Sequence, residues 1–562
     1  MRTSAASSTV SSDHQTPVMK KGGWITLPFL AVSVVGLGMA MSATSSNLIV
    51  YLIRKYNVKS IDAAQISNIV RGCMQLAPVL GAAVSDAYFG CYPVVAAGAA
   101  ISLLSFVVFT LTATLPSLRP PPCAAASPSS FSCQPPSATQ AAVLYAAVCL
   151  LAVGNGGTRY NAATLVAEQF AGGGEEEERR RGRDAFFSWY FVFLYASYMA
   201  GDTALVYLQD SVSWALGLGV CAVTTGLDLV ALVAGSRYYR RPVPKGSPFT
   251  ALARVVVAAA RKATLSSSSL ARMQFLNRAA MIAAGETDPS VASASPSPWR
   301  LCTVREVEDL KSLLRVLPLW SSGILVSMTV NAQVSLTVLQ ALTMDRALGP
   351  RLAVPAASMP VAVLAAFVLS AALFDRLVAP RWERRLTPLR RVGLGHALNV
   401  ASMAAAALVE RRRIRVAARA QHGGGGAGGG GEALALPMSA LWLVAQLTLT
   451  GAEEAMHLPG NTALFYREFP AALRSTATAM PPLFIAVGSY LSTAFVDVVR
   501  RATGWLPDDD LNRSRLDRVY WTLALVAAAN FGYFLACAIT YRYNNYAVDG
   551  DEKADHQILE DK

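Results

Sequence analysis

Long apolar stretches alternate with short polar connections along the whole chain. Each stretch is about twenty residues long, which lets an α-helix cross a hydrocarbon core about 30 Å thick. The pattern therefore predicts an all-α membrane protein with twelve transmembrane helices. The predicted segments are 26–52, 64–85, 92–115, 138–161, 186–208, 213–235, 313–339, 355–375, 391–409, 434–457, 478–499 and 517–540.

Composition strengthens this interpretation. Of the 562 residues, 53% are hydrophobic and 15% are charged, and the mean hydropathy is +0.38; soluble proteins average about 25% charged residues. The net charge of +13 is better explained by basic cytoplasmic loops than by nucleic acid, so we expect membrane lipid around the chain and no nucleic-acid partner. The polar, Ser-rich N-terminus does not have the pattern of a removable signal peptide.

Positive charge places both termini in the cytoplasm. The even-numbered connections are rich in Arg and Lys, and one basic run, which starts at Glu410, breaks the rule by falling outside. Two six-helix halves with a site between them describe the major facilitator fold. The predicted parts are a cytoplasmic tail (1–24), a first bundle (25–236), a cytoplasmic linker (237–312), a second bundle (313–541) and a cytoplasmic tail (542–562).

Two connecting segments have a composition of their own. Within the linker, 247–262 predicts a short helix with Arg254 and Arg261 on one face. This helix can lie on the membrane surface, cover the two bundles or act as a plain linker. The glycine tract at 423–431 is of low complexity, and we assign it no function.

A short motif after the second segment indicates a gate. Gly81, Asp86 and Gly90 have the Gly-x4-Asp-x3-Gly spacing that resembles the gating motif of the major facilitator superfamily. Asp375 occupies the corresponding place after the eighth segment. An acidic residue there can meet arginines and helix N-termini and hold one conformation, although a solvated turn would look the same.

The cysteines predict no metal site. Most lie singly in apolar segments, as small hydrophobic residues. Cys123 and Cys133 share a Pro/Ser-rich connection on the predicted outer face, where they can form a disulfide. Asn512, in "NRS", is a candidate glycosylation acceptor on the same face.

Several motifs resemble the plant nitrate and peptide transporter family, the plant branch of the proton-dependent oligopeptide transporters. They are "GGWITLPF", "NLIVYL", "GNGGTRYN", "FLNRAA", "WRLCTVREVEDLKSLLRVLPLW" and "VLQALTMDR". The resemblance covers Gly22 to Tyr541, and the run from Asn47 onwards is similar to the nitrate excretion transporter subgroup. It implies the major facilitator fold, a small anion or small molecule as cargo, and usually proton coupling.

The first helix departs from the family pattern. Most members carry Glu-x-x-Glu-Arg/Lys at positions that correspond here to Val34, Leu37 and Gly38, so all three ionisable groups are missing. A side chain that does not titrate cannot carry a proton, which argues against conventional proton coupling. Gly36 and Gly38 instead predict close helix packing.

Other helices supply candidate polar groups. Asn331 stands where some nitrate-transporting relatives place a His, and an amide can donate hydrogen bonds to an anion without titrating. Glu454 matches the family's tenth-helix Glu, and His457 follows on nearly the same face, so the two are candidates for proton coupling. Alternatively, Glu453 and Glu454 mark a helix kink that faces water.

The fourth and fifth helices complete the candidate site. Tyr190 and Tyr195 either line a cavity with hydroxyl groups or simply pack. Arg159 lies in an apolar segment, where a charge costs roughly 3 kcal/mol on insertion scales. In the family a cation here pairs with first-helix acids; without them, Arg159 can bind a mobile anion, pair with Glu454 or Glu168, or reach the cytoplasmic surface.

Taken with the resemblance, these residues imply a secondary transporter of nitrate or a similar small anion such as chloride, working as a low-affinity efflux carrier in the plasma membrane by alternating access. Two rival functions are transport of a larger organic cargo (hormone, glucoside or peptide) and a membrane receptor that transports nothing. The sequence has no P-loop, no His-Glu-x-x-His and no nucleophile constellation, so we expect neither an enzyme nor a cofactor.

Overall fold

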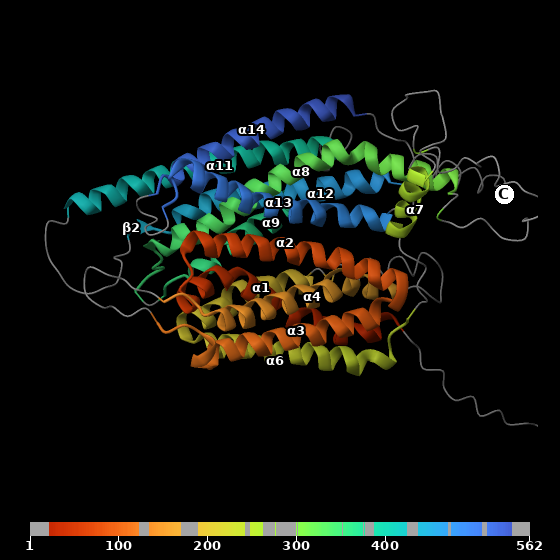
Figure 1. Cartoon of the computed structure of the whole chain (residues 1–562), viewed down its shortest axis with the longest axis horizontal. Helices are drawn as coiled ribbons and strands as arrows, with labels where there is room; N and C mark the ends of the chain where they lie inside the picture. The colour runs from red at the N-terminus through yellow and green to blue at the C-terminus, as the bar shows by residue number, and fades with distance from the viewer. Residues whose placement is uncertain are drawn as a thin grey trace, which may run out of the picture.

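The helices of the computed structural model fall into two halves that lie side by side (Figure 1). Two opposite ends of the molecule are named here after elements that lie there: the α7 end, after α7 (Pro248–Arg261), and the β2 end, after β2 (Leu436–Ser439). The residues that the structure describes are 22–122, 134–169, 189–190, 192–241, 248–261, 276, 299, 302–350, 352–374, 376, 387–423, 436–469, 474–507 and 514–541.

The N-terminal half consists of helices that run between the two ends. Its first helix ends at Asn57, whose left-handed backbone (φ 53°) is one that asparagine tolerates. Its fourth helix begins with a capping box, in which Ser137 and Gln140 each accept a hydrogen bond from the other's backbone N–H. The helices are α1 (Leu27–Tyr56), α2 (Ser60–Val84), α3 (Cys91–Thr114), α4 (Ala138–Glu168), the helical segment 192–212 and α6 (Trp214–Ala234).

The C-terminal half repeats this plan. Its first helix also begins with a capping box, formed by Thr303 and Glu306. A short strand, β1 (Met344–Asp345), pairs in parallel with β2 at the β2 end. The helices are α8 (Val304–Leu342), α9 (Val361–Leu373), α11 (Pro388–Gly423), α12 (Trp442–Glu468), α13 (Arg474–Thr503) and α14 (Leu516–Thr540).

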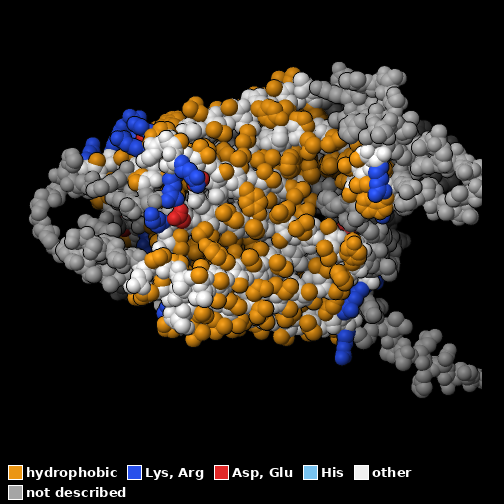
Figure 2. Space-filling model, in the orientation of Figure 1, with side chains coloured by type: hydrophobic (Ala, Val, Ile, Leu, Met, Phe, Trp, Pro, Cys, Tyr) orange, Lys and Arg blue, Asp and Glu red, His pale blue; other side chains and the backbone are white. Residues whose placement is uncertain are grey.

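The surface is that of a membrane protein. Hydrophobic side chains cover the middle of the face seen in Figure 2, and Lys and Arg side chains gather toward its ends. Within the described chain, nine helices are long and apolar enough to cross a membrane. α2 and α12 are of similar length but carry ionisable residues, among them Arg71 and Glu454. The predicted all-α fold with two six-helix halves is confirmed.

Some predicted boundaries were wrong. α11 continues through Glu410 to Gly423, so the basic run expected in a connection begins as helix. The buried Arg413 guanidinium lies 2.7 Å from Glu410, which satisfies both charges within this helix. α8 starts at Val304, inside the predicted linker, because its capping box initiates the helix there.

α7 lies in the predicted linker and packs against the first turns of α8. Val255, Ala258 and Ala259 form an apolar cluster with Val307 and Leu310. In Figure 1, α7 stands across the end of the C-terminal half. The helix therefore covers the start of α8 at the α7 end.

Glycines bring α2, α3 and α4 into close contact. A Cβ atom at Gly81 would lie 1.9 Å from the backbone oxygen of Gly156, and one at Gly157 would lie 2.8 Å from the Cα of Gly98. The glycine run before Arg159 thus admits neighbouring helices rather than a ligand. Because these backbones touch, the position of Arg159 is fixed by helix packing.

Candidate functional site

A cavity of about 470 Å³ lies between the two halves, near the middle of their helices. α1, α2, α4 and the segment 192–212 line one wall, and α8, α9, α12 and α13 line the other. The polar and charged residues that line it are Ser42, Arg71, Gln75, Arg159, Tyr160, Tyr195, Tyr198, Asp202, Ser327, Asn331, Glu453, Glu454 and His457.

Most of the binding and proton-coupling residues predicted from the sequence meet at this cavity. Arg159, Asn331, Tyr195, Glu454 and His457 all line it. The remaining candidate, Tyr190, is buried beside a smaller cavity that Arg159 also lines.

Arg159 has no carboxylate partner within the described chain, where no hydrogen bond or ion pair reaches its guanidinium. Four tyrosine side chains line the same two cavities as Arg159, namely Tyr160, Tyr190, Tyr195 and Tyr198. Neither of the pairs considered for it, with Glu454 or with Glu168, is formed. The guanidinium therefore keeps its donors available at the cavity surface.

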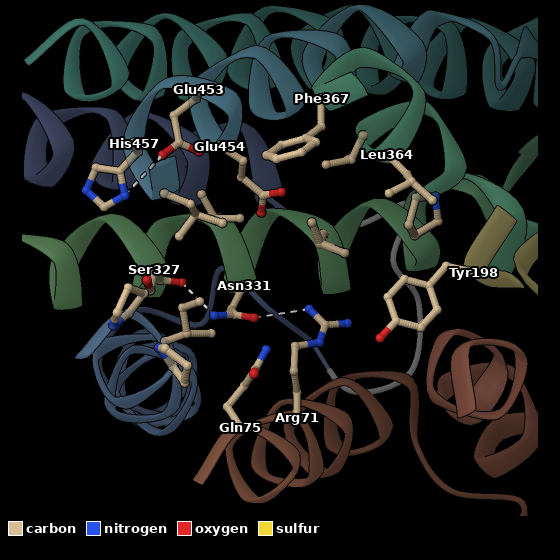
Figure 3. Close-up of a pocket in the computed structure, with 18 of the residues that line it drawn as sticks. Arg71, Gln75, Tyr198, Ser327, Asn331, Leu364, Phe367, Glu453, Glu454 and His457 are labelled. Atoms are coloured by element: carbon tan, nitrogen blue, oxygen red, sulfur yellow. Dashed lines mark hydrogen bonds and ion pairs between the residues drawn. The ribbon is translucent and has the colours of Figure 1, made fainter. Parts of the chain in front are cut away.

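A second cavity arginine, Arg71 on α2, is engaged with the protein. Its Nη1 donates a hydrogen bond to Oδ1 of Asn331 on α8 at 3.1 Å, so the bond joins the two halves (Figure 3). The Asn331 amide also donates to the Ser327 backbone oxygen at 2.7 Å. Glu454 and Asp202 interact electrostatically with the Arg71 charge. Arg71 is thus surrounded by acceptors, unlike Arg159.

Asp202 is buried at the cavity wall and is held by hydroxyl groups of α1. Ser42 and Ser46 donate hydrogen bonds to its Oδ1 at 2.6 and 2.8 Å. Its backbone oxygen accepts a bond from Ser358 of the C-terminal half at 2.7 Å. A fixed, hydrogen-bonded carboxylate of this kind balances the nearby Arg71 charge.

The α12 wall holds three titratable side chains close together. Glu453 and His457 are buried and lie one helical turn apart, with Nδ1 of His457 4.0 Å from Oε1 of Glu453 (Figure 3). The neighbour of His457 is therefore Glu453 and not Glu454, the residue expected to share a proton with it. His396 of α11 meets the His457 ring edge-on, with 5.3 Å between ring centroids.

This cluster is only partly hydrogen-bonded. Among the described residues, neither Oε2 of Glu453 nor Nε2 of His457 has a hydrogen-bond partner. Buried polar atoms are rarely left unsatisfied, and functional groups are among the exceptions. The suggestion that both glutamates face bulk water was wrong for Glu453, which is 1% exposed.

Contacts between the halves extend from the middle of the helices to the β2 end. Asp62 and Arg500 form an ion pair at 2.6 Å, and Asp210 lies 3.8 Å from Arg346. Deeper in the molecule, Asn68 on α2 accepts a hydrogen bond from Ser335 at 2.5 Å. These contacts hold the two halves together at the β2 end.

The predicted gating residues lie at the α7 end. Gly81 packs against α4, and Gly90 has a positive φ of 78°, which favours glycine. Asp86 lies in the turn between them, where burial raises the pKa of its carboxyl. Asp375, Cys123, Cys133 and Asn512 lie outside the described residues.

Arg71, Asp202 and Glu453 were not singled out as binding or coupling residues from the sequence. Each is an ionisable residue inside an apolar segment, the same signal that drew attention to Arg159. Arg71 and Asp202 lie in the predicted segments 64–85 and 186–208, so the same signal could have identified both.

Comparison with known proteins places the chain in a family. The PTR2 profile, which describes the POT family, matches residues 92–510. Protein NRT1/PTR FAMILY 2.3 of Arabidopsis thaliana is 42% identical to this chain, with 96% of each chain covered. Protein NRT1/PTR FAMILY 2.7 of the same plant is 41% identical, with 98% of each covered.

Solved structures share the fold at low sequence identity. An auto-inhibited POT family peptide transporter superposes with a TM-score of 0.69 at 15% identity, covering 93% of this chain and 98% of that one. The POT family transporter PepTSo gives a TM-score of 0.67 at 16% identity, covering 92% and 99%. The resemblance found in the sequence is confirmed, and the chain belongs to the POT family of membrane transporters.

Proposed function

We propose that the protein is a secondary transporter of nitrate or a similar small anion such as chloride. The observation that carries the proposal is the Arg159 guanidinium, which lines the central cavity with no carboxylate partner among the described residues. A cation that the protein does not neutralise offers its planar N–H fork to an anion, and bidentate contact suits an oxyanion.

Neighbouring side chains would complete the anion site. The hydroxyl groups of Tyr190 and Tyr195 can donate hydrogen bonds toward a ligand on Arg159. Asn331 has a less direct role, because its oxygen accepts from Arg71 and one amide proton is already used. We propose that Asn331 positions Arg71 and offers its second amide proton to the anion.

Protons, where they take part, would bind the C-terminal half. Glu454 lines the cavity with no hydrogen bond among the described residues, and His457 lies beside Glu453. α1 has no titratable side chain at Val34, Leu37 or Gly38. We therefore propose Glu454 and His457 as the proton-coupling candidates, with weak coupling or none.

Alternating access would use the two halves as rocking bodies. The ion pairs at the β2 end would separate when that end opens. At the α7 end, Asp86, with Gly81 and Gly90 shaping its turn, would latch the opposite state, and Asp375 would do the same in the second half. The anion would then reach Arg159 from one end at a time.

We place the protein in the plasma membrane, with both termini in the cytoplasm, and propose efflux as its net direction. A cell interior negative by about 100 mV favours the exit of a monovalent anion by roughly 2.3 kcal/mol. Efflux through a uniporter then needs no proton gradient, which agrees with the absence of ionisable side chains at Val34, Leu37 and Gly38 of α1.

Transport of a larger organic anion is the second candidate. Its support is the cavity volume of about 470 Å³, far more than one nitrate fills. Cavities of about 300–1,000 Å³ usually hold drug-sized ligands. A zwitterion could place its carboxylate on Arg159 and its ammonium group on Glu454.

Flux in proteoliposomes separates the two candidates. Purified protein would be reconstituted, and efflux of labelled nitrate measured alone and with an excess of chloride or of an organic anion outside. We expect nitrate flux in wild-type protein and none above background in Arg159→Ala. Flux of the organic anion without nitrate flux would favour the second candidate, and ligand binding without any flux would indicate a receptor.

A further inference from the structure

A second, smaller cavity adjoins the central one inside the N-terminal half. Its volume is about 60 Å³, and its walls come from α1, α3, α4 and the start of the fifth helix. Arg159 and Tyr198 line both cavities, so this side pocket opens beside the guanidinium. The residues used in the argument below are Val34, Leu37, Gly38, Arg159, Tyr190 and Tyr198.

The side pocket occupies the place where an ionisable cluster is missing. Val34, Leu37 and Gly38 line it, and these are the three α1 positions where the family pattern has ionisable residues and this chain has none. A longer side chain at these positions would extend into the space, and a Glu there would pair with Arg159. Loss of those side chains therefore leaves both a cavity and an arginine without a carboxylate partner within the described chain.

Close helix contacts keep the pocket from collapsing. A Cβ at Gly38 would lie 2.2 Å from Oγ of Ser197, and one at Gly36 would lie 2.5 Å from the backbone oxygen of Thr224. α1 therefore touches the fifth and sixth helices on either side of the pocket. These contacts fix the spacing of the helices that carry the lining side chains.

The volume limits what the pocket can hold. A single water needs roughly 10–15 Å³ of such space, so about 60 Å³ accepts a few atoms and no more. Nitrate and chloride fit this limit. Peptides, glucosides and hormones do not, and they would have to remain in the central cavity.

The lining favours a weakly hydrated oxyanion. Val34 and Leu37 give the pocket apolar walls, and the donors of the polar lining residues Ser33, Asn155 and Thr158 already bond Asp228 and backbone oxygens. An anion that enters therefore loses water, and few donors there replace it. Nitrate holds its hydration water less strongly than chloride, and two of its oxygens can accept from the guanidinium fork. Tyr190 and Tyr198 also line the pocket, and their hydroxyl groups are candidate donors to the third oxygen.

We infer that this side pocket is the binding site of the transported anion and that it selects planar monovalent oxyanions of nitrate size over chloride and over organic anions. The inference rests on the proposed function. It adds that the anion binds inside the N-terminal half, beside α1, and that Tyr195 and Asn331, which line the larger cavity, contact the anion on its path to this pocket.

Filling the pocket tests this inference. Val34→Phe adds a ring inside it, whereas Val32→Phe makes the same change on the same helix at a side chain that is 49% exposed on the outside. In purified full-length protein, we expect Val34→Phe to weaken nitrate binding by at least about tenfold and Val32→Phe to leave it unchanged. Thermal unfolding of each variant shows whether the fold is retained.

A second variant covers the case in which the added ring unfolds the protein. Leu37→Ala enlarges the pocket, so we expect affinity for methanesulfonate, a slightly larger oxyanion, to rise at least about threefold relative to nitrate. If the ratio of methanesulfonate affinity to nitrate affinity is the same in Leu37→Ala as in wild-type protein, the anion does not bind in the side pocket.

The outcomes separate this inference from the proposed function. Wild-type nitrate affinity in folded Val34→Phe, with binding lost in Arg159→Ala, would place the anion in the central cavity and overturn only the inference. Absence of nitrate binding in wild-type protein would overturn both.

Discussion

The two walls of the central cavity carry opposite chemistry. The N-terminal half contributes both arginines, Arg71 and Arg159. The C-terminal half contributes Glu453, Glu454 and His457, and its described lining residues include no Arg or Lys. A guanidinium keeps its charge at any biological pH, whereas Glu and His can gain or lose a proton when their surroundings change. The N-terminal wall therefore holds the two fixed cations together with Asp202, a carboxylate held by hydrogen bonds from Ser42 and Ser46, and the C-terminal wall holds the adjustable charges.

This difference gives the halves separate tasks. On the N-terminal wall, Arg71 already has Asn331, Asp202 and Glu454 around it, so only Arg159 is left to attract a ligand. On the C-terminal wall, the charge of the glutamates sets how strongly the walls attract one another. An anion on Arg159 weakens that attraction and so favours separation of the halves, which is what a carrier needs for release.

Among the variants considered, removal of Arg159 should have the largest effect on the difference between the two walls. We expect Arg159→Ala to lose nitrate binding by about 2–5 kcal/mol, the usual range for a truncated charge contact, with an unchanged melting temperature. Arg159→Lys keeps the charge but not the fork and should retain weak transport. Arg501→Ala, at a side chain that is 80% exposed, is the matched control. Nitrate binding that survives in Arg159→Ala would make Arg159 a structural residue.

The driving force of transport shows whether the titratable residues of the C-terminal wall couple transport to protons. Because α1 has no titratable side chain at Val34, Leu37 or Gly38, nitrate flux should follow the membrane potential, and about 100 mV should shift its equilibrium by roughly 2.3 kcal/mol. A pH gradient of similar size should have little effect. Proteoliposomes with imposed potassium or proton gradients would measure both. Concentrative uptake driven by pH alone would contradict this prediction, and Glu454→Gln and His457→Gln would then identify the proton site.

Arg71 should behave differently from Arg159, although both line one cavity. Arg71→Ala leaves Asn331, Asp202 and Glu454 without their cation, so we expect a loss of stability of about 1–3 kcal/mol. Glu454→Gln in the same protein should restore part of it, because one uncompensated charge is removed. Differential scanning calorimetry of the single and double variants measures the coupling energy between Arg71 and Glu454. If Arg71→Ala and Arg159→Ala are equally stable, the proposal that Arg71 is structural and Arg159 binds the ligand would be wrong.

The fold was predictable because membrane helices leave a strong signal. Twenty-residue apolar runs identified the helices, and the repeat of Asp86 by Asp375 indicated two related halves. The ends of the helices were less predictable, since capping at Thr303 and the Arg413–Glu410 pair extend helices into polar sequence.

The site was predictable only one residue at a time. Arg159 stood out because a charge in an apolar run is costly. Within the described chain, Arg159 has no carboxylate partner, whereas Arg71 bonds Asn331. This difference depends on which helices face each other, and hydropathy does not encode that. The pairing of His457 with Glu453 likewise depends on the rotation of α12.

The β2 end reverses the charge pattern of the cavity, and the smallest predicted effect lies there. The acids Asp62 and Asp210 belong to the N-terminal half, and their partners across the interface, Arg500 and Arg346, belong to the C-terminal half. If these pairs hold the end closed, Asp62→Asn should favour opening. A partly exposed pair contributes only about 0.2–1 kcal/mol, so we expect hydrogen exchange of the nearby helix ends to rise by about fivefold at most.

Asp497→Asn is the matched control for this last experiment, since Asp497 pairs with Arg501 within α13 and not across the halves. The same amide substitution there should leave exchange at the β2 end unchanged. High salt should reduce the difference between wild-type protein and Asp62→Asn, because exposed ion pairs are screened. Equal exchange in both variants would mean that the polar contacts deeper in the interface, such as Ser335 with Asn68, keep this end closed without the ion pairs. The ion pairs at the β2 end would then have no part in gating. The difference in charge between the two halves would matter only at the central cavity.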